Sequence, residues 1–285
     1  MSTKYLHILY LWIEGYFPKR VAFYLLSKNL CSSVEQLYRG ETNDPQLRIV
    51  RVDFVPGQGF VSQDPENPLP DGKSLPALRL DDASGTSRWI SETYSMITYF
   101  EDLYPGNDST NLRQMQAKEA ADRAIAQDII GILTTADNDG GVWLSNCAPI
   151  AADFKNIPER ERNLAVGHRG KRSMEDNLKA AQTIASGNLE ATGWLTPRAD
   201  GGPGIADVIY AANVRYMQLS WCEFIIERED LGQLRSWYEK FQTLPFWHEM
   251  EETGRFPKEV QWGPGSVLKY YRETGVEIWD GEISG

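Results

Sequence analysis

Hydrophobic positions follow two different periods along this chain, and the change between them falls near residue 107. Before that point, short runs rich in aliphatic, aromatic and β-branched residues predict strands over residues 6–12 and 47–55. After it, the apolar positions recur with the spacing of helices, and strand-like runs are absent from the pattern. The helices are expected over residues 112–135, 158–187, 205–221 and 231–249.

The first part of the chain predicts a mixture of strands and helices. Pro18 suits the first turn of a helix that continues through residues 21–30, because its missing N–H is not needed there. A loop with a short helical turn follows. Residues 56–74 are dense in Gly, Pro, Asp and Asn, which is typical of an irregular connection.

A hairpin and a helix complete this part. The segments ALRL and TSRWI flank DDASG, in which Gly85 suits a left-handed turn position. Ser91 is the expected N-cap of the following helix, and Pro105-Gly106 is its stop signal. The opening strand, helix and strand favour a right-handed crossover with parallel pairing, to which the hairpin adds antiparallel strands. We therefore predict an α/β domain over residues 1–106 and an all-α domain over residues 107–285.

Composition narrows the classes of partner. The formal net charge is −11, which disfavours nucleic acids and anionic membrane surfaces. The one basic cluster, residues 168–172, is short and is interpreted as a solvated flank. No apolar run is long enough to cross a membrane. Three widely spaced cysteines and three histidines without metal-ligand spacing indicate reduced thiols in a cytoplasmic protein, without a metal site.

Residues 74–106 carry the most specific motif. The stretch Leu75-Pro76-Ala77-Leu78 precedes the hairpin, Glu92-Thr93 follows it, and Tyr99-Phe100 closes the segment. Together with PGIADVIYAA at residues 203–212 and the order of the domains, this set resembles the glutathione transferase family. The resemblance is to a divergent member of a fungal type. It implies a thioredoxin-like first domain, glutathione as the bound thiol, a hydrophobic small molecule as second substrate, and a homodimer.

The residues of this motif suit the capture of a small peptide. If the bond before Pro76 is cis, as the resemblance implies, the backbone of Leu75 faces outward and could bind an extended peptide by strand-like hydrogen bonds. Glu92 and Thr93 stand at a helix start, where free N–H groups attract a carboxylate and Glu92 could accept from an ammonium group. Ordinary helix capping is the alternative. We interpret Asp207, three residues after Gly204, as half of a capping box.

The residue that activates the thiol is ambiguous in the sequence. The Ser and Cys types of the family carry it six positions before the valine of a basic-Val pair, which here is Gly15. Tyr16 is the first alternative and Tyr10, at the end of the first strand, is the second; backbone N–H groups or a residue of the helical domain are the others. A nearby anion would explain Lys19 and Arg20 at a helix N-terminus and makes Arg20 a candidate to bind glutathione, although a solvated face would explain both residues equally well.

The sequence thus predicts attack of a glutathione thiolate on an electrophilic apolar molecule. Trp143, Trp194, Tyr210 and Tyr216 are candidate pocket residues, with plain core as the alternative. The long 56–74 connection and the tail after residue 256 suggest a specialised enzyme of a fungal-type biosynthetic pathway. Two rivals stay open. One is a binding or regulatory protein without catalysis, and the other is a glutathione-dependent isomerase, lyase or cyclase.

Overall fold

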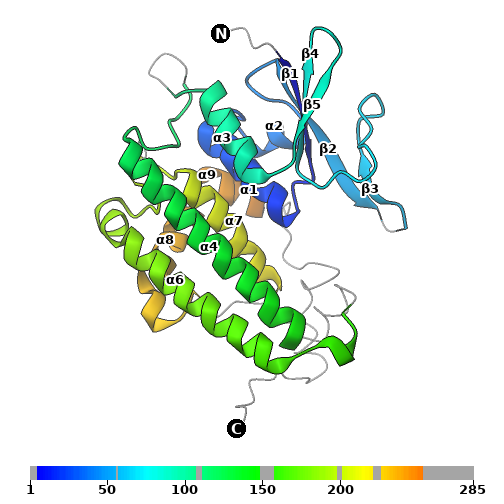
Figure 1. Ribbon diagram of the computed structural model, residues 1–285. Helices are drawn as coiled ribbons and strands as arrows, with labels where there is room; N and C mark the ends of the chain where they lie inside the picture. The colour runs from blue at the N-terminus through cyan, green and yellow to red at the C-terminus, as the bar shows by residue number, and fades with distance from the viewer. Residues whose placement is uncertain are drawn as a thin grey trace.

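The protein consists of a five-stranded sheet region followed by a helical region, as a computed structural model shows (Figure 1). The structure describes residues 5–55, 57–106, 111–147, 157–197, 201–220 and 226–252. Helices α1 (Tyr16–Lys28) and α3 (Thr93–Leu103) lie between the sheet and the helical region. The predicted fold class, a thioredoxin-like domain followed by an all-helical one, is confirmed.

The sheet has the strand order β3-β2-β1-β4-β5, in which β1 and β2 are parallel and the other neighbours are antiparallel. Its strands are β1 (Tyr5–Leu11), β2 (Leu47–Val55), β3 (Gly59–Ser62), β4 (Ala77–Asp82) and β5 (Ser87–Ile90). The parallel pair follows from the crossover through α1. Gly85 turns the β4–β5 hairpin with a φ of 81°, a value at which a glycine is favoured. The predicted strands and hairpin are therefore confirmed.

The alternation of β1 separates two apolar layers. Leu9 and Leu11 belong to the large core that includes α1 and α3, whereas Ile8 and Tyr10 belong to a smaller cluster on the other face of the sheet. Side chains two residues apart share a face of a strand, so this division follows directly from the sequence of β1. The short helix α2 (Val34–Tyr38) confirms the predicted helical turn before β2.

Two details of the first part differ from the sequence prediction. Strand β3 lies inside the 56–74 segment, which the Gly and Pro content had marked as irregular throughout. Its Phe60 and Val61 are strand formers that pair with β2 despite the flanking glycines. Glu92, and not Ser91, is the N-cap residue of α3, and its side chain makes no capping hydrogen bond.

The helical region is built around a long antiparallel pair, α4 (Ala120–Cys147) and α6 (Leu164–Thr192), which runs across the front of Figure 1. Helix α7 (Ile205–Ser220) packs between this pair and α1. The remaining elements of the described region are η1 (Glu159–Glu161), η2 (Glu229–Leu231), α8 (Gly232–Gln242) and α9 (Pro245–Glu252).

The predicted helix bounds in this region are only partly right, and α6 begins and ends several residues later than the expected 158–187. Residues 112–119 are not helical, because backbone groups at Met115 and Gln116 donate to Glu101 and not to a preceding turn. The helix expected over residues 231–249 is broken in two, and Pro245 begins the second half. Helix α4 continues twelve residues beyond Thr135. The predicted domain boundary at Asn107 and the tail after residue 256 lie outside the described residues.

Asp207 is a structural joint of the helical region. Its carboxylate accepts from the backbone N–H of Gly204 at 2.8 Å, which confirms the expected capping contact. It also accepts from the N–H groups of Leu195 and Thr196 and from Nε1 of Trp237. A buried carboxylate with four donors fixes the start of α7 against its neighbours.

Candidate functional site

The candidate site lies at the end of the sheet where β1 finishes and β4 begins. Tyr10 near the end of β1 pairs with Ala77 at the start of β4, and Leu78 of β4 pairs with Ile90 at the end of β5. The segments that follow β1, precede β4 and follow β5 therefore lie at this one edge. Leu75-Pro76 is a cis peptide bond, as the resemblance implied. The backbone of Leu75 makes no hydrogen bond to the described residues. It is therefore available to an extended ligand at the edge of the sheet.

The start of α3 supplies the polar part of this edge. Glu92 is exposed, and no side chain caps the helix, so its first N–H groups face outward with the positive end of the helix dipole. Thr93 is buried at 6% exposure and forms the first residue of the helix. The predicted residues Leu75, Pro76, Glu92 and Thr93 thus come together at one edge. An anion beside α3 and a cation beside Glu92 would both be stabilised there.

Gly15 is the N-cap residue of α1 and has no room for a side chain. A Cβ atom built there would lie 2.5 Å from Cε3 and 3.0 Å from Cζ3 of Trp12. The ring of Trp12 also contacts Phe60 of β3, with 5.0 Å between the ring centroids. An aromatic ring therefore occupies the space that a Ser or Cys side chain would need.

Tyr16, the first residue of α1, lies against the helical region. Its ring makes an edge contact with Tyr216 of α7, with centroids 4.8 Å apart, and its hydroxyl interacts with Asp137 of α4. Burial, followed by the charge of Asp137, raises the pKa of Tyr16 well above the usual value of a tyrosine. Tyr16 is therefore a neutral hydrogen-bond donor at neutral pH. Tyr16 as a whole residue is half-buried.

Tyr16 belongs to a buried polar group that we name the Asp137 cluster, which contains Tyr16, Arg20, Asp137 and Asn213. Arg20 lies 3.5 Å from Asp137 through Nη2 and donates from Nε to Asn213 Oδ1 at 2.8 Å. Asn213 in turn donates to Asp137 Oδ2. The anion that balances the charge of Arg20 is thus the carboxylate of Asp137. Arg20, expected to bind glutathione, is 8% exposed and is engaged inside the domain interface.

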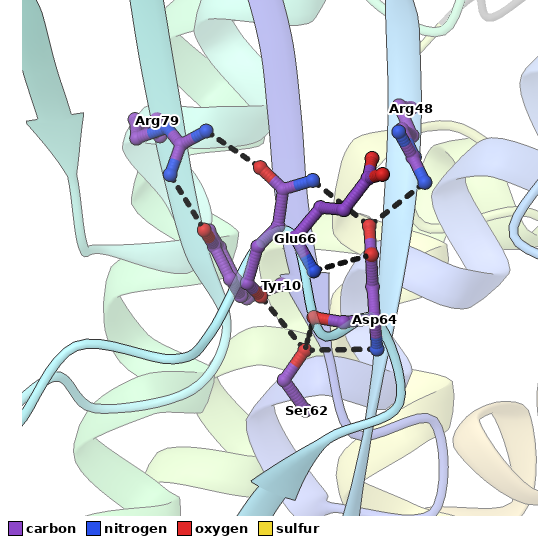
Figure 2. A network of polar contacts seen from close by, with 7 residues as sticks. Tyr10, Arg48, Ser62, Asp64, Glu66 and Arg79 are labelled. Carbon is purple, nitrogen blue, oxygen red and sulfur yellow. Dashed lines mark hydrogen bonds and ion pairs between the residues drawn. The ribbon is translucent and has the colours of Figure 1, made fainter.

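Tyr10 is placed away from the start of α1. It lies on the face of the sheet opposite α1, and its hydroxyl accepts from Nη1 of Arg79 at 2.8 Å (Figure 2). Arg79 also donates to Asn67, which donates to Asp64, so this network fixes the loop after β3 over the sheet. Burial raises the pKa of Tyr10. Tyr10 and Tyr16 thus serve different sides of the molecule, and only Tyr16 stands at the start of α1.

Of the four aromatic residues proposed for a pocket, only Tyr216 lies beside Tyr16. Trp143, Trp194 and Tyr210 are at most 5% exposed and belong to the core, which corrects the pocket interpretation for these three. Sequence reasoning missed Asp137 and Asn213. Each interrupts a buried apolar stripe of its helix, and this interruption is the signal that could have identified them.

Among the described residues, no group of three His, Cys, Asp or Glu side chains could hold a metal ion. In the same part of the chain, no helix combines the length and the apolar character needed to cross a bilayer. Cys31 and Cys147 are buried and form no disulfide within the part of the chain that the structure describes, and Cys222 lies outside it.

Solved structures share this architecture. A glutathione S-transferase from Methylobacillus flagellatus with glutathione bound is 12% identical, with a TM-score of 0.55, and the match covers 85% of this chain and 98% of that one. A glutathione transferase family member from Pseudomonas fluorescens, also with glutathione, is 14% identical at a TM-score of 0.55 and covers 85% and 97%.

A maleylacetoacetate isomerase from Anaeromyxobacter dehalogenans, with glutathione in its active site, is 14% identical at a TM-score of 0.56, with coverage of 90% and 99%. No family model and no curated protein sequence matches the chain. At these identities the likeness concerns the fold.

Proposed function

We propose that this protein is a glutathione S-transferase-like enzyme that binds glutathione at the edge formed by Leu75, Pro76, Glu92 and Thr93. The observation that carries the proposal is the convergence of a free strand-like backbone at Leu75 with the uncapped start of α3. An extended tripeptide with a terminal carboxylate and ammonium group suits these two features. Structures of the same fold with glutathione bound support the choice of peptide.

In the proposed reaction the glutathione sulfur attacks an electrophilic carbon of an apolar small molecule. Tyr16 donates a hydrogen bond to the sulfur as its proton leaves, which stabilises the thiolate. Binding both reactants at one edge supplies proximity. Trp12, which follows β1, and the half-exposed Phe17 give the second substrate an apolar surface beside this edge.

The binding site is tested by calorimetry with glutathione and two variants of α3. Glu92→Gln removes the charge that faces the ammonium group, and we expect about a tenfold weaker affinity, which is the usual size for one hydrogen bond to a charged group. Asp102→Asn is the matched control, because Asp102 is also an exposed acid of α3 but lies at the other end. An equal affinity of all three proteins would contradict the assignment of the edge, and absence of binding would contradict the proposed function.

A glutathione-dependent isomerase is the second candidate, because two of the similar structures are named maleylacetoacetate isomerase. A binding protein without catalysis is the third, and it is favoured by the lack of side-chain space at Gly15. Product analysis separates the three. Conjugation gives an adduct with the mass of glutathione, isomerisation consumes no glutathione, and a binding protein gives neither product.

We also propose a cytoplasmic homodimer with a specialised substrate, as expected for a divergent fungal-type member. Phe54 and Phe60 form an exposed aromatic pair on the edge hairpin, with ring centroids 5.5 Å apart, which supports contact with a second copy. Light scattering on the full chain tests this. A mass of 32.3 kDa would indicate a monomer and contradict the dimer.

A further inference from the structure

The Asp137 cluster contains an acid whose contacts are incomplete. The side chain of Asp137 is 7% exposed, and its Oδ2 atom faces Arg20 and Asn213. No geometrically ideal hydrogen bond reaches Oδ1 within the described residues. Burying a carboxylate without a full set of donors costs free energy, so such a group calls for an explanation.

The position of this acid points to Tyr16. The Tyr16 hydroxyl interacts with the Asp137 carboxylate, and Arg20 contacts both residues, since its guanidinium lies 5.1 Å from the centroid of the Tyr16 ring and 3.5 Å from Asp137. Tyr16 is half-buried and begins the helix that follows β1, and β1 ends at the edge where the thiol is proposed to bind. It therefore stands between this edge and the acid of the helical region. A proton can pass along such a pair without Asp137 touching the ligand.

We propose that Asp137 accepts the proton of the glutathione thiol through Tyr16, so that α4 supplies the base for the sulfur. This inference rests on the proposed function. The S–H bond breaks, its proton goes to the Tyr16 oxygen, and the electron pair stays on sulfur. The Tyr16 O–H proton goes to the Asp137 carboxylate at the same time. The products are a thiolate, a neutral Tyr16 that donates to the sulfur, and a neutral Asp137.

The surroundings of Asp137 suit this exchange. From α1 the charged group that faces it is Arg20 and the titratable group is Tyr16; from α7 the neighbour is the neutral Asn213. Ser173 and Asn177 of α6 donate hydrogen bonds to Asp139, which is the next acid of α4. Burial raises the pKa of Asp137 to about 7, although Arg20 and Tyr16 lower it. An acceptor with this pKa exchanges protons readily near neutral pH.

The test counts the protons released to solvent when glutathione binds at about pH 8, by calorimetry in buffers of different ionisation enthalpy, in four proteins. These are the wild type, Asp137→Asn, Asp137→Glu and Asp139→Asn, which is the matched control because Asp139 contacts α6 and not Tyr16. We expect the wild type to release almost no proton, because the thiol proton stays on Asp137, and Asp137→Asn to release about one for each thiolate formed. Asp137→Glu should retain the proton like the wild type, and Asp139→Asn should do the same.

Calorimetry on each protein distinguishes a failure of the proposed function from a failure of this inference alone. Absence of glutathione binding by the wild type overturns the proposed function and this inference with it. Equal proton release on glutathione binding by the wild type and Asp137→Asn overturns only the role of Asp137. Infrared difference spectra of the wild type test the same inference without Asp137→Asn, in case that variant does not fold. A protonated carboxyl band should grow when glutathione binds above about pH 7, where Asp137 of the free protein is mostly ionised, and this gain should be absent in Tyr16→Phe. No such gain in the wild type would overturn the inference.

Discussion

Helix α1 carries two buried ion pairs, two helical turns apart, whose surroundings differ. At its C-terminal end, Lys28 lies 2.7 Å from Glu101, whose Oε1 also accepts from Tyr24 at 2.7 Å. The backbone N–H groups of Met115 and Gln116 donate to Oε2 of Glu101. At the N-terminal end, Asp137 has a looser contact with Arg20 at 3.5 Å and an incompletely bonded Oδ1.

This difference distinguishes Glu101, a carboxylate with a structural role, from Asp137, a carboxylate of the candidate site. A carboxylate with every acceptor position used is held in one position, and Glu101 ties α1, α3 and the segment before α4 together. A carboxylate with spare acceptor capacity beside a tyrosine can change its charge state during a reaction. Four changes test this comparison, in order of decreasing expected effect.

Removing the charge of Glu101 should cause the largest loss of stability. Glu101→Gln leaves Lys28 as a buried cation without a counter-charge, and we expect the free energy of unfolding to fall by about 3 to 5 kcal/mol in urea denaturation. The double variant Lys28→Met/Glu101→Gln should lose less, because no unpaired charge remains. A loss below about 1 kcal/mol in the single variant would contradict the structural role of this pair.

Asp137→Asn should change how stability depends on pH. The pKa of Asp137 is about 7 in the folded protein, above its usual value, so the folded state holds one more proton than the unfolded state between about pH 4 and 7. Stability from this group is therefore present at low pH and lost as the pH rises towards 7. As the pH rises from 5 to 7, the free energy of unfolding of Asp137→Asn should increase by about 2 kcal/mol relative to that of the wild type. A constant difference in urea denaturation would refute this account, and Asp139→Asn is the control.

Gly15→Ser and Gly15→Ala should both destabilise the protein, by about 1 to 3 kcal/mol, because Cβ meets the ring of Trp12. The two losses should be similar, since the clash begins at Cβ and not at the hydroxyl. Thermal unfolding measures them. Gains in stability, as expected for a glycine replaced in open space, would show that Trp12 does not fill this position.

Tyr10→Phe should have the smallest effect. It removes the hydrogen bond from Arg79 and should cost about 1 kcal/mol in urea denaturation. The thiolate midpoint of bound glutathione should not change, because Tyr10 lies on the other face of the sheet from α1. A midpoint that rises in Tyr10→Phe as much as in Tyr16→Phe would transfer the activating role to Tyr10.

The sequence was sufficient for the elements whose pattern is local. The strand β1, the turn at Gly85 and the acid at Asp207 each depend on a few neighbouring residues, and each was predicted correctly. The edge formed by Leu75 and Glu92 was predicted from the resemblance together with the hairpin.

Features that depend on tertiary packing were not predicted. The end of α4 contains Asp, Asn and Gly, which weaken a helical pattern. Close packing on α6 overrides this, since a Cβ at Gly170 would lie 2.8 Å from the Asp139 carbonyl oxygen. Because the predicted helix stopped at Thr135, Asp137 fell in an expected loop and its place in a buried stripe was hidden.

The central claim is that the protein ionises bound glutathione through the pair at the start of α1. The most direct measurement is the ultraviolet difference spectrum of glutathione bound to the wild type and to Tyr16→Phe across a range of pH. We predict a thiolate band at neutral pH in the wild type and a midpoint shifted upward in Tyr16→Phe. Bound glutathione without a thiolate band at neutral pH, or an identical midpoint in the two proteins, would contradict the claim.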